Sequence, residues 1–193
     1  WTADRTESFL TDAHGRDHLT TATLGLDDDG KFLALKVDTL ANMGGYLCST
    51  GSLIPTYMYA TMLSGQYVIP AIFNRTRAVY TNTCPVDAYR GAGRPEAIYL
   101  IERLVNKVAM ETGLGPEEVR RRNFVQPEQM PYTTATGEKY DSGDFPRVME
   151  RALKEADWDG FAARRAETET RGWKRGRGIA YYVEATAGMP EES

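Results

Sequence analysis

Apolar and polar residues alternate in the first part of the chain and predict a β-hairpin over residues 18–41. Residues 18–26 are rich in threonine and apolar residues, and residues 32–39 alternate with the period of a strand that buries one face. Three aspartates and a glycine at 27–30 separate these stretches and predict the turn, because glycine accepts a positive φ angle.

The hairpin is followed by a segment without a regular period. Residues 42–72 are rich in glycine, serine, tyrosine and methionine, and we expect a long ordered loop with short helical turns. Loops of this length inside a compact domain usually carry a function or cover a neighbouring part of the protein. Residues 74–81 then predict a third strand.

Helical spacing dominates the second half of the chain. A helix is predicted from Pro95 to Gly113, with one apolar face made of Ala97, Ile101, Leu104 and Val108. A second, short helix is predicted over residues 115–123, with acidic residues at its start and arginines at its end. We interpret these arginines as charges that complement the helix dipole and not as a phosphate site.

Two further helices and a strand are predicted towards the end of the sequence. One helix starts near Ser142 or Asp144, and it has an apolar stripe: Phe145, Val148, Met149, Ala152, Leu153 and Ala156. Residues 158–170 predict a polar, exposed helix, and residues 178–185 predict a strand. A hairpin and further strands with helices packed against them indicate an α+β fold.

Composition and charge exclude some functional classes of protein. The formal net charge is −4 and the pI is about 5.3, which argues against a general nucleic-acid binder, because such proteins need a basic surface. No apolar run approaches the roughly 20 residues of a membrane span. The first residue is Trp1, and we interpret both ends as cuts in a longer polypeptide.

Cysteine and histidine residues offer little to a metal ion. Cys48 and Cys84 have no metal-binding spacing, and we expect reduced, buried side chains in a cytoplasmic protein, with a disulfide as the open alternative. His14 and His18 are four residues apart, but the interval lacks the glutamate of a zinc-protease helix. No metal ligand is therefore predicted.

A glycine-bearing bend, residues 88–96, lies between the third strand and the helix that follows it. The sequence is Ala88-Tyr89-Arg90-Gly91-Ala92-Gly93-Arg94-Pro95-Glu96. One interpretation is a tight turn without a ligand. A dinucleotide-binding turn is disfavoured, because its third glycine is replaced by a glutamate that would repel a pyrophosphate. The third interpretation is a loop whose bare main chain and flanking arginines lie against a bulky anionic cofactor.

A family resemblance favours the third interpretation. Residues 86–97 resemble the active-site loop of the molybdopterin-binding large subunit of molybdenum hydroxylases, the family of xanthine dehydrogenase, aldehyde oxidase and aerobic carbon monoxide dehydrogenase, in its form II carbon monoxide dehydrogenase version. The resemblance covers essentially the whole chain, and further motifs that match lie at 1–7, 14–18, 116–123, 131–132, 140–145 and 177–184. Several separated motifs in one order are more specific than a single loop.

The resemblance implies a molybdenum-dependent oxidoreductase that uses water-derived oxygen to hydroxylate a small molecule. It implies molybdopterin cytosine dinucleotide as the cofactor, lined by Tyr89, Arg90, Gly91, Ala92 and Gly93, with Arg90 as the catalytic residue. It also implies iron–sulfur clusters and FAD on partner domains or subunits. The fold implied is part of the cofactor-binding domain, a β-hairpin and mixed sheet with packed helices.

The sequence also departs from the family. Copper-bearing carbon monoxide dehydrogenases have a cysteine in this loop where the chain has Gly91, so an aldehyde or N-heterocycle substrate is favoured over carbon monoxide. The family's upstream glycine-rich loop and its C-terminal glutamate base are missing. We therefore expect residues 1–193 to be the first half of the domain, inactive alone and without bound cofactor. The alternative is a non-catalytic binding or scaffold module that retained the fold.

Overall fold

The computed structural model describes residues 1–184, and its centre is a three-stranded sheet. β1 (His18–Leu26) pairs antiparallel with β2 (Phe32–Asn42), which confirms the predicted hairpin. β3 (Ala71–Val79) pairs parallel with the other edge of β2, so the sheet is mixed and β2 is its central strand. In the turn, the Asp27 carboxylate accepts hydrogen bonds from the backbone N–H groups of Asp29 and Lys31.

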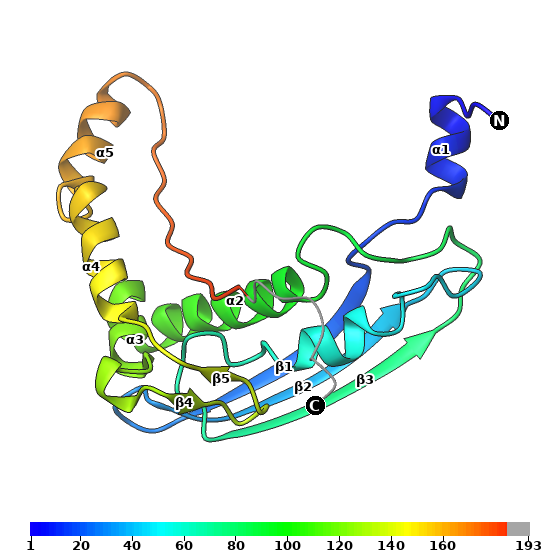
Figure 1. The fold of residues 1–193 in the computed structure, drawn as a ribbon. Coiled ribbons are helices and arrows are strands. Elements are labelled where there is room, and N and C mark those ends of the chain that lie inside the picture. Colours follow the sequence, from blue (N-terminus) through cyan, green and yellow to red (C-terminus); the bar gives the residue numbers. More distant parts are fainter. Residues whose placement is uncertain (185–193) are drawn as a thin grey trace.

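The core lies between the sheet and one long helix, α2 (Arg94–Thr112), which crosses one face of the sheet (Figure 1). Ala97, Ile101, Val105 and Val108 of α2 are buried, and they pack with Leu35 and Val37 of β2 in one cluster. Gly113 ends the helix in a left-handed conformation, as predicted. The long loop between β2 and β3 contributes Tyr59, Leu63 and Tyr67 to the same core and contains the π-helix Ile54–Met58.

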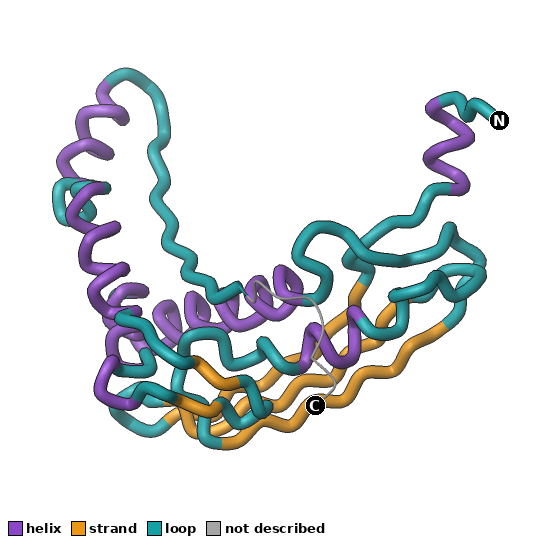
Figure 2. The backbone as a smooth tube through the Cα atoms, in the orientation of Figure 1, coloured by secondary structure: helices purple, strands orange, loops and turns teal. Residues whose placement is uncertain are grey.

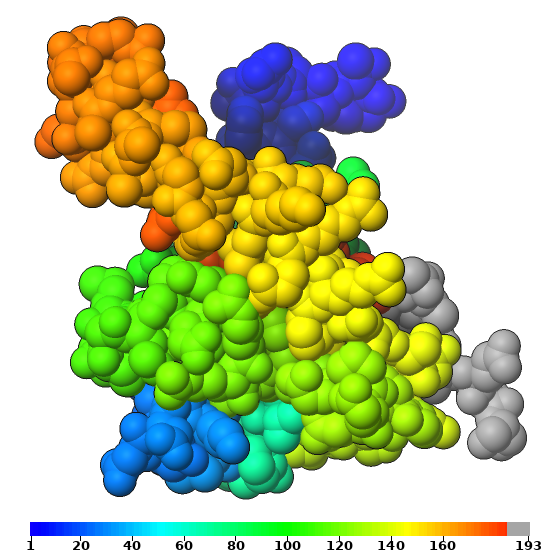
Figure 3. Space-filling model, turned by 90° about the vertical axis from the view of Figure 1, so that its left-hand side faces the viewer, coloured from blue at the N-terminus to red at the C-terminus, as the bar shows by residue number. Residues whose placement is uncertain are grey.

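The remaining helices extend away from this core. α3 (Pro116–Asn123) packs beside α2, and α4 (Phe145–Glu155) and α5 (Phe161–Thr170) form an arm that rises from it (Figures 1 and 2). The short helix α1 (Arg5–Thr11) stands at the opposite end of the molecule, and Figure 3 shows both projections above the main body. A 3-10 turn (Pro127–Gln129) and a small hairpin of β4 (Tyr132–Thr133) and β5 (Lys139–Tyr140) complete the elements.

The architecture confirms an α+β fold and corrects several details. The strand predicted at 178–185 is wrong for residues 178–184, which are extended but pair with no strand, and Ala185 lies outside the described residues. The main chain of this segment is instead bonded to side chains: Tyr181 N–H donates to Glu102, and the Ile179 carbonyl accepts from Arg120. An extended sequence without a neighbouring strand cannot form a ladder.

Two predictions about burial also need correction. Only Met149 and Leu153 of the α4 stripe are buried, because the arm covers little of the sheet, and Val148 stays exposed. Cys48 and Cys84 are free thiols, as predicted, but they are half-buried and not part of the core. In residues 1–184, no helix is both long and apolar enough to cross a membrane.

Candidate functional site

The bend before α2 has an unusual backbone. Gly91, Ala92 and Gly93 have φ angles of 91°, 40° and 90°, three consecutive residues in a region that side chains disfavour. The Ala92 N–H donates to the Tyr89 carbonyl at 2.7 Å, and the Arg94 N–H donates to the Gly91 carbonyl at 3.2 Å. The Glu96 carboxylate accepts from the Gly93 N–H at 3.0 Å and so caps the first turn of the helix.

Gly93 is required by close packing as well as by its φ angle. A Cβ atom there would lie 2.6 Å from the Ile54 carbonyl oxygen and 2.8 Å from the Tyr59 amide nitrogen. The bend therefore rests directly on the π-helix of the long loop, which explains why that loop is ordered and partly buried. A Cβ at Gly91 would lie 2.5 Å from the Pro95 ring, so the bend and the first turn of α2 also determine each other.

Arg16 holds the bend from the other side, and sequence reasoning did not identify it as a site residue. Its guanidinium donates to the Arg90 carbonyl, lies 4.6 Å from the centroid of the Tyr89 ring, and reaches within 3.9 Å of the Glu96 carboxylate. Two backbone bonds between His14 and the 85–87 segment bring Arg16 to this position. The only sequence signal was the motif at 14–18, which assigned no role to the arginine.

The predicted site residues lie together but differ in exposure. Tyr89 and Arg90 are exposed, Gly91 and Ala92 are half-buried, and Gly93 is buried. Residues 89–90 of the bend therefore face outward, while Gly91 and Gly93 allow the bend to pack closely against the rest of the protein. One main-chain donor expected to face a ligand, the Ala92 N–H, is already used within the turn.

Arg94 connects the bend with the last described segment. Its guanidinium lies 3.7 Å from the Glu184 carboxylate and 3.5 Å from the Gly91 carbonyl; the Arg94 side chain is largely shielded from solvent, whereas Glu184 is exposed. Arg94 therefore stabilises the inner side of the bend, whereas the Arg90 side chain points to solvent on its outer side. The two flanking arginines, which the sequence treated as equivalent, have different positions.

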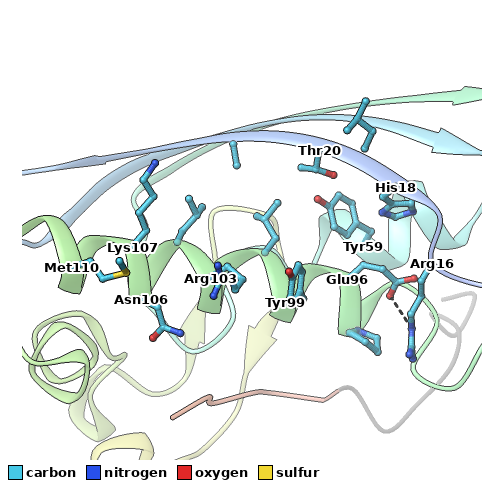
Figure 4. Close-up of a pocket in the computed structure, with 15 residues that line it drawn as sticks. Arg16, His18, Thr20, Tyr59, Glu96, Tyr99, Arg103, Asn106, Lys107 and Met110 are labelled. Atoms are coloured by element: carbon cyan, nitrogen blue, oxygen red, sulfur yellow. Dashed lines mark ion pairs between the residues drawn. The ribbon is translucent and has the colours of Figure 1, made fainter. Parts of the chain in front are cut away.

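A groove of about 970 Å³ runs from the bend along α2 and β1 (Figure 4). We call it the β1–α2 groove, and its walls include His18, Thr20 and Ala22 of β1 and Tyr99, Leu100 and Leu104 of α2. Figure 4 shows Arg16, Glu96, His18 and Tyr59 at one end and Lys107 and Met110 at the other. The lining of the groove is mainly apolar, with charged side chains at both ends.

Two titratable side chains are held at the end of the groove near the bend. Burial lowers the pKa of His18, although the Glu96 and Asp17 carboxylates act in the opposite direction. The His18 ring meets the Tyr59 ring edge-on at a centroid distance of 5.3 Å, and burial raises the pKa of the Tyr59 hydroxyl, which lies 3.3 Å from the Thr39 hydroxyl. A neutral imidazole is therefore favoured here.

The described residues offer no preformed metal site of their own. No three His, Cys, Asp or Glu side chains among residues 1–184 are grouped so that they could hold an ion. His14 and His18 lie on different local structures, an exposed β-bridge and a half-buried strand. A metal at this bend would have to arrive within a cofactor that carries its own ligands.

Comparison with known proteins identifies what this bend and sheet are similar to. Residues 1–124 match the family model described as the molybdopterin cofactor-binding domain. The chain is 35% identical to the carbon monoxide dehydrogenase large chain of Hydrogenophaga pseudoflava, and this match covers 100% of the chain and 24% of that protein. It is 32% identical to the 6-hydroxypseudooxynicotine dehydrogenase complex subunit gamma of Paenarthrobacter nicotinovorans, covering 95% of the chain and 24% of that protein.

A solved structure agrees with these matches. Quinoline 2-oxidoreductase from Pseudomonas putida 86 superimposes with a TM-score of 0.82 at 33% identity, over 89% of the chain and 22% of that structure's chain. The chain thus spans about a quarter of the length of the curated relatives that it matches.

Proposed function

Because this chain belongs to the molybdopterin cofactor-binding domain family of molybdenum hydroxylase large subunits, we propose that it forms one wall of a molybdenum cofactor site within a longer large subunit. The observation that carries this proposal is the bend 89–93, a conformationally costly backbone held in place from both sides and exposed at Tyr89 and Arg90. Backbone strain of this kind persists where the surrounding structure imposes it, often at functional sites.

The residues present fit an anionic, pterin-held metal. The bend offers a cationic side chain, Arg90, and little side-chain bulk at 91–93, while Arg16 fixes the direction of the Arg90 carbonyl. No side chain here needs to ligate the metal, because the cofactor would bring the metal's ligands with it. Once bound, the cofactor would supply a two-electron oxidation that places a water-derived oxygen on the substrate carbon.

The proposal gives each residue of the bend a role at the cofactor site. Arg90, the proposed catalytic residue, stabilises negative charge beside the reacting carbon through its guanidinium. Tyr89, whose ring lies under the Arg16 guanidinium, would form part of the wall of the cofactor site, and Gly91, Ala92 and Gly93 would allow the main chain to approach the cofactor. The Arg16–Glu96 pair would hold the bend without touching the cofactor, and His18 lies at the adjoining end of the β1–α2 groove.

The proposed substrate is an aldehyde or an electron-poor N-heterocycle. Gly91 supplies no thiolate, so a copper ion cannot be held at that position of the bend. One structural neighbour is a quinoline 2-oxidoreductase, an enzyme named for an N-heterocycle.

We further propose the cytosine dinucleotide form of the cofactor, iron–sulfur and flavin partner subunits, and a cytoplasmic location. Residues 1–193 alone would form the first half of the domain, inactive and without cofactor.

The test uses the complete large subunit with its partner subunits. Arg90→Ala should lower turnover of aldehyde and N-heterocycle substrates with a dye acceptor by roughly a hundredfold, the loss expected when one oxyanion-stabilising group is removed. Arg151→Ala, which removes an exposed arginine of α4 that pairs with Glu155, is the matched control and should leave turnover unchanged. Molybdenum content per subunit is measured in both. Normal turnover in Arg90→Ala would contradict the assignment, and a wild-type subunit without molybdenum would favour the scaffold alternative.

A further inference from the structure

The free edge of β1 has the hydrogen-bonding groups of a strand that has a neighbour on one side only. In residues 1–184, β1 pairs with β2 alone. The Asn42 N–H donates to the Asp17 carbonyl, so by the alternation of antiparallel ladders the odd-numbered residues of β1 bond to β2. The backbone N–H and C=O groups of Thr20, Ala22 and Leu24 therefore point to the free edge.

The sequence of β1 lacks the devices that usually protect a free edge. Its nine residues contain no Lys, Arg, Asp, Glu or Pro, and Leu19 is 72% exposed. β3, the other edge strand, carries Arg75 and Arg77, which both pair with the Asp38 carboxylate on the outer face of the sheet. The two edge strands thus differ: β3 carries charged side chains that discourage pairing with a further strand, and β1 carries none.

The β1–α2 groove lies directly along this open edge. Side chains of Ala22 and Thr20 form one wall, and Leu100 and Leu104 of α2 form the other. At its rim Tyr99 and Met110 are 70% and 84% exposed, which is unusual for large apolar side chains grouped along one groove. Arg103 and Lys107 stand beside them, so the outer rim is basic.

We propose that β1 accepts an additional strand, supplied by another segment of the same large subunit, whose alternate apolar side chains fill the β1–α2 groove. Main-chain bonds to residues 20, 22 and 24 would give affinity, and acidic side chains would face Arg103 and Lys107. This proposal rests on the proposed function, because the occupant belongs to the longer polypeptide. The relatives carry such additional chain, since this sequence spans 24% of their length.

The first experiment is residue-resolved hydrogen exchange on the complete large subunit. The amides of Thr20, Ala22 and Leu24 should exchange at least about a hundredfold more slowly than unprotected amides, as the β2-bonded amides of Thr21 and Thr23 do. Fast exchange at 20, 22 and 24 alongside slow exchange at 21 and 23 would overturn the proposal. This readout does not require molybdenum, so it is independent of the proposed function, which molybdenum content and turnover test.

The second experiment identifies the occupant. A photo-crosslinking amino acid replaces Tyr99 at the groove or, as the control, Phe73 on the opposite face of the sheet, where the side chain is also more than half exposed. A cross-link from position 99 to a distant segment of the same polypeptide supports the proposal. A cross-link from 99 to a partner subunit or a second copy, or no cross-link from 99, overturns it.

Discussion

The middle of α2 and its N-terminal end differ in how their polar groups are satisfied. In the middle, Glu102 forms an ion pair with Arg120 of α3, and the two residues are 5% and 0% exposed. Two N–H groups of the Arg120 guanidinium donate to one oxygen of the carboxylate, at 2.5 Å and 3.2 Å. At the N-terminal end, the bend 89–93 presents the exposed Tyr89 and Arg90, and the β1–α2 groove exposes apolar side chains. One helix thus links a closed polar cluster with an open surface.

Both charges of the closed cluster have several hydrogen-bond partners among the described residues. Glu102 also accepts from the Tyr67 hydroxyl at 2.5 Å, from Gln66 at 3.1 Å and from the Tyr181 N–H at 2.9 Å. Arg120 donates in addition to three oxygens, those of the Pro116 and Ile179 carbonyls and of the Asn106 side chain. Burial and the Glu102 charge raise the pKa of Tyr67 well above its usual value, so its hydroxyl remains a donor.

The difference separates what this chain needs for folding from what it offers to other groups. A buried charge is tolerated only when its partners are all present, and here four segments converge on one carboxylate and one guanidinium: the loop at 66–67, α2, α3 and residues 179–181. The bend, by contrast, has its backbone fixed from both sides, while the side chains of Tyr89 and Arg90 stay exposed. Three variants can break or sharpen this contrast, beginning with the cluster.

Arg120→Ala should have the largest effect on stability. It leaves the Glu102 carboxylate buried without its cation, which typically costs about 3–5 kcal/mol of unfolding free energy. Urea unfolding followed by circular dichroism measures the loss. Arg121→Ala is the matched control on the same helix, because Arg121 is partly exposed in its pairs with Glu150 and Glu118 and should contribute less than about 1 kcal/mol. Equal losses in the two variants would contradict the cluster's special role.

Gly93→Ala should have the next largest effect and tests the fixed inner side of the bend. The new Cβ would collide with the Ile54 carbonyl and the Tyr59 amide, so we expect a loss of about 2–4 kcal/mol from strain and overpacking together. Gly137 provides a matched control, because its φ of 93° is nearly the same and nothing lies within 4 Å of its Cβ position. Gly137→Ala should therefore cost only about 1 kcal/mol.

Thermal unfolding of both glycine variants measures this difference. If Gly137→Ala lowers stability as much as Gly93→Ala does, backbone conformation alone explains the requirement for glycine. The close packing of the bend against the π-helix would then contribute nothing to stability. If only Gly93→Ala is damaging, the packing of the bend is the cause.

The same contrast explains which features the sequence could predict. The hairpin and α2 follow from local periodicity, because their apolar faces are continuous, and Gly113 marks the helix end. The bend 89–93 was located by its glycines. Arg16, however, reaches the bend through backbone pairing between segments about 70 residues apart, and no local pattern encodes that contact.

The buried ion pair was missed for a related reason. Arg120 is the first of three arginines at the end of α3, and a run of this kind normally lies in solvent, as Arg121 and Arg122 partly do. The one available signal was that Glu102 lies between Ile101 and Val105 on the apolar face of α2. A charge on such a face needs a buried partner, but sequence spacing alone does not say which one.

The smallest expected effect is a change in the pH dependence of stability, caused by His18 at the junction of the bend and the groove. Its pKa is lowered in the folded protein, mainly by burial, while Glu96 and Asp17 act in the opposite direction. The Tyr59 ring packs against it, and Arg16 adds a positive charge at the same end of the groove. The folded state thus favours the neutral imidazole.

The sign of the effect follows from proton linkage. Above the ordinary histidine pKa of about 6.5, both states are neutral at His18 and its contribution to stability is fully present. As the pH falls below that value, the unfolded chain binds the proton first, so stability decreases until the folded state is also protonated. His18→Asn should remove this decrease, whereas His14→Asn, which replaces the exposed second histidine, should retain it. Unfolding midpoints in urea between pH 5 and pH 7.5 measure it. An unchanged slope in His18→Asn would show that Glu96 and Asp17 fully offset the effect of burial on the His18 pKa. The folded protein would then have no greater preference for the neutral imidazole than the unfolded chain has.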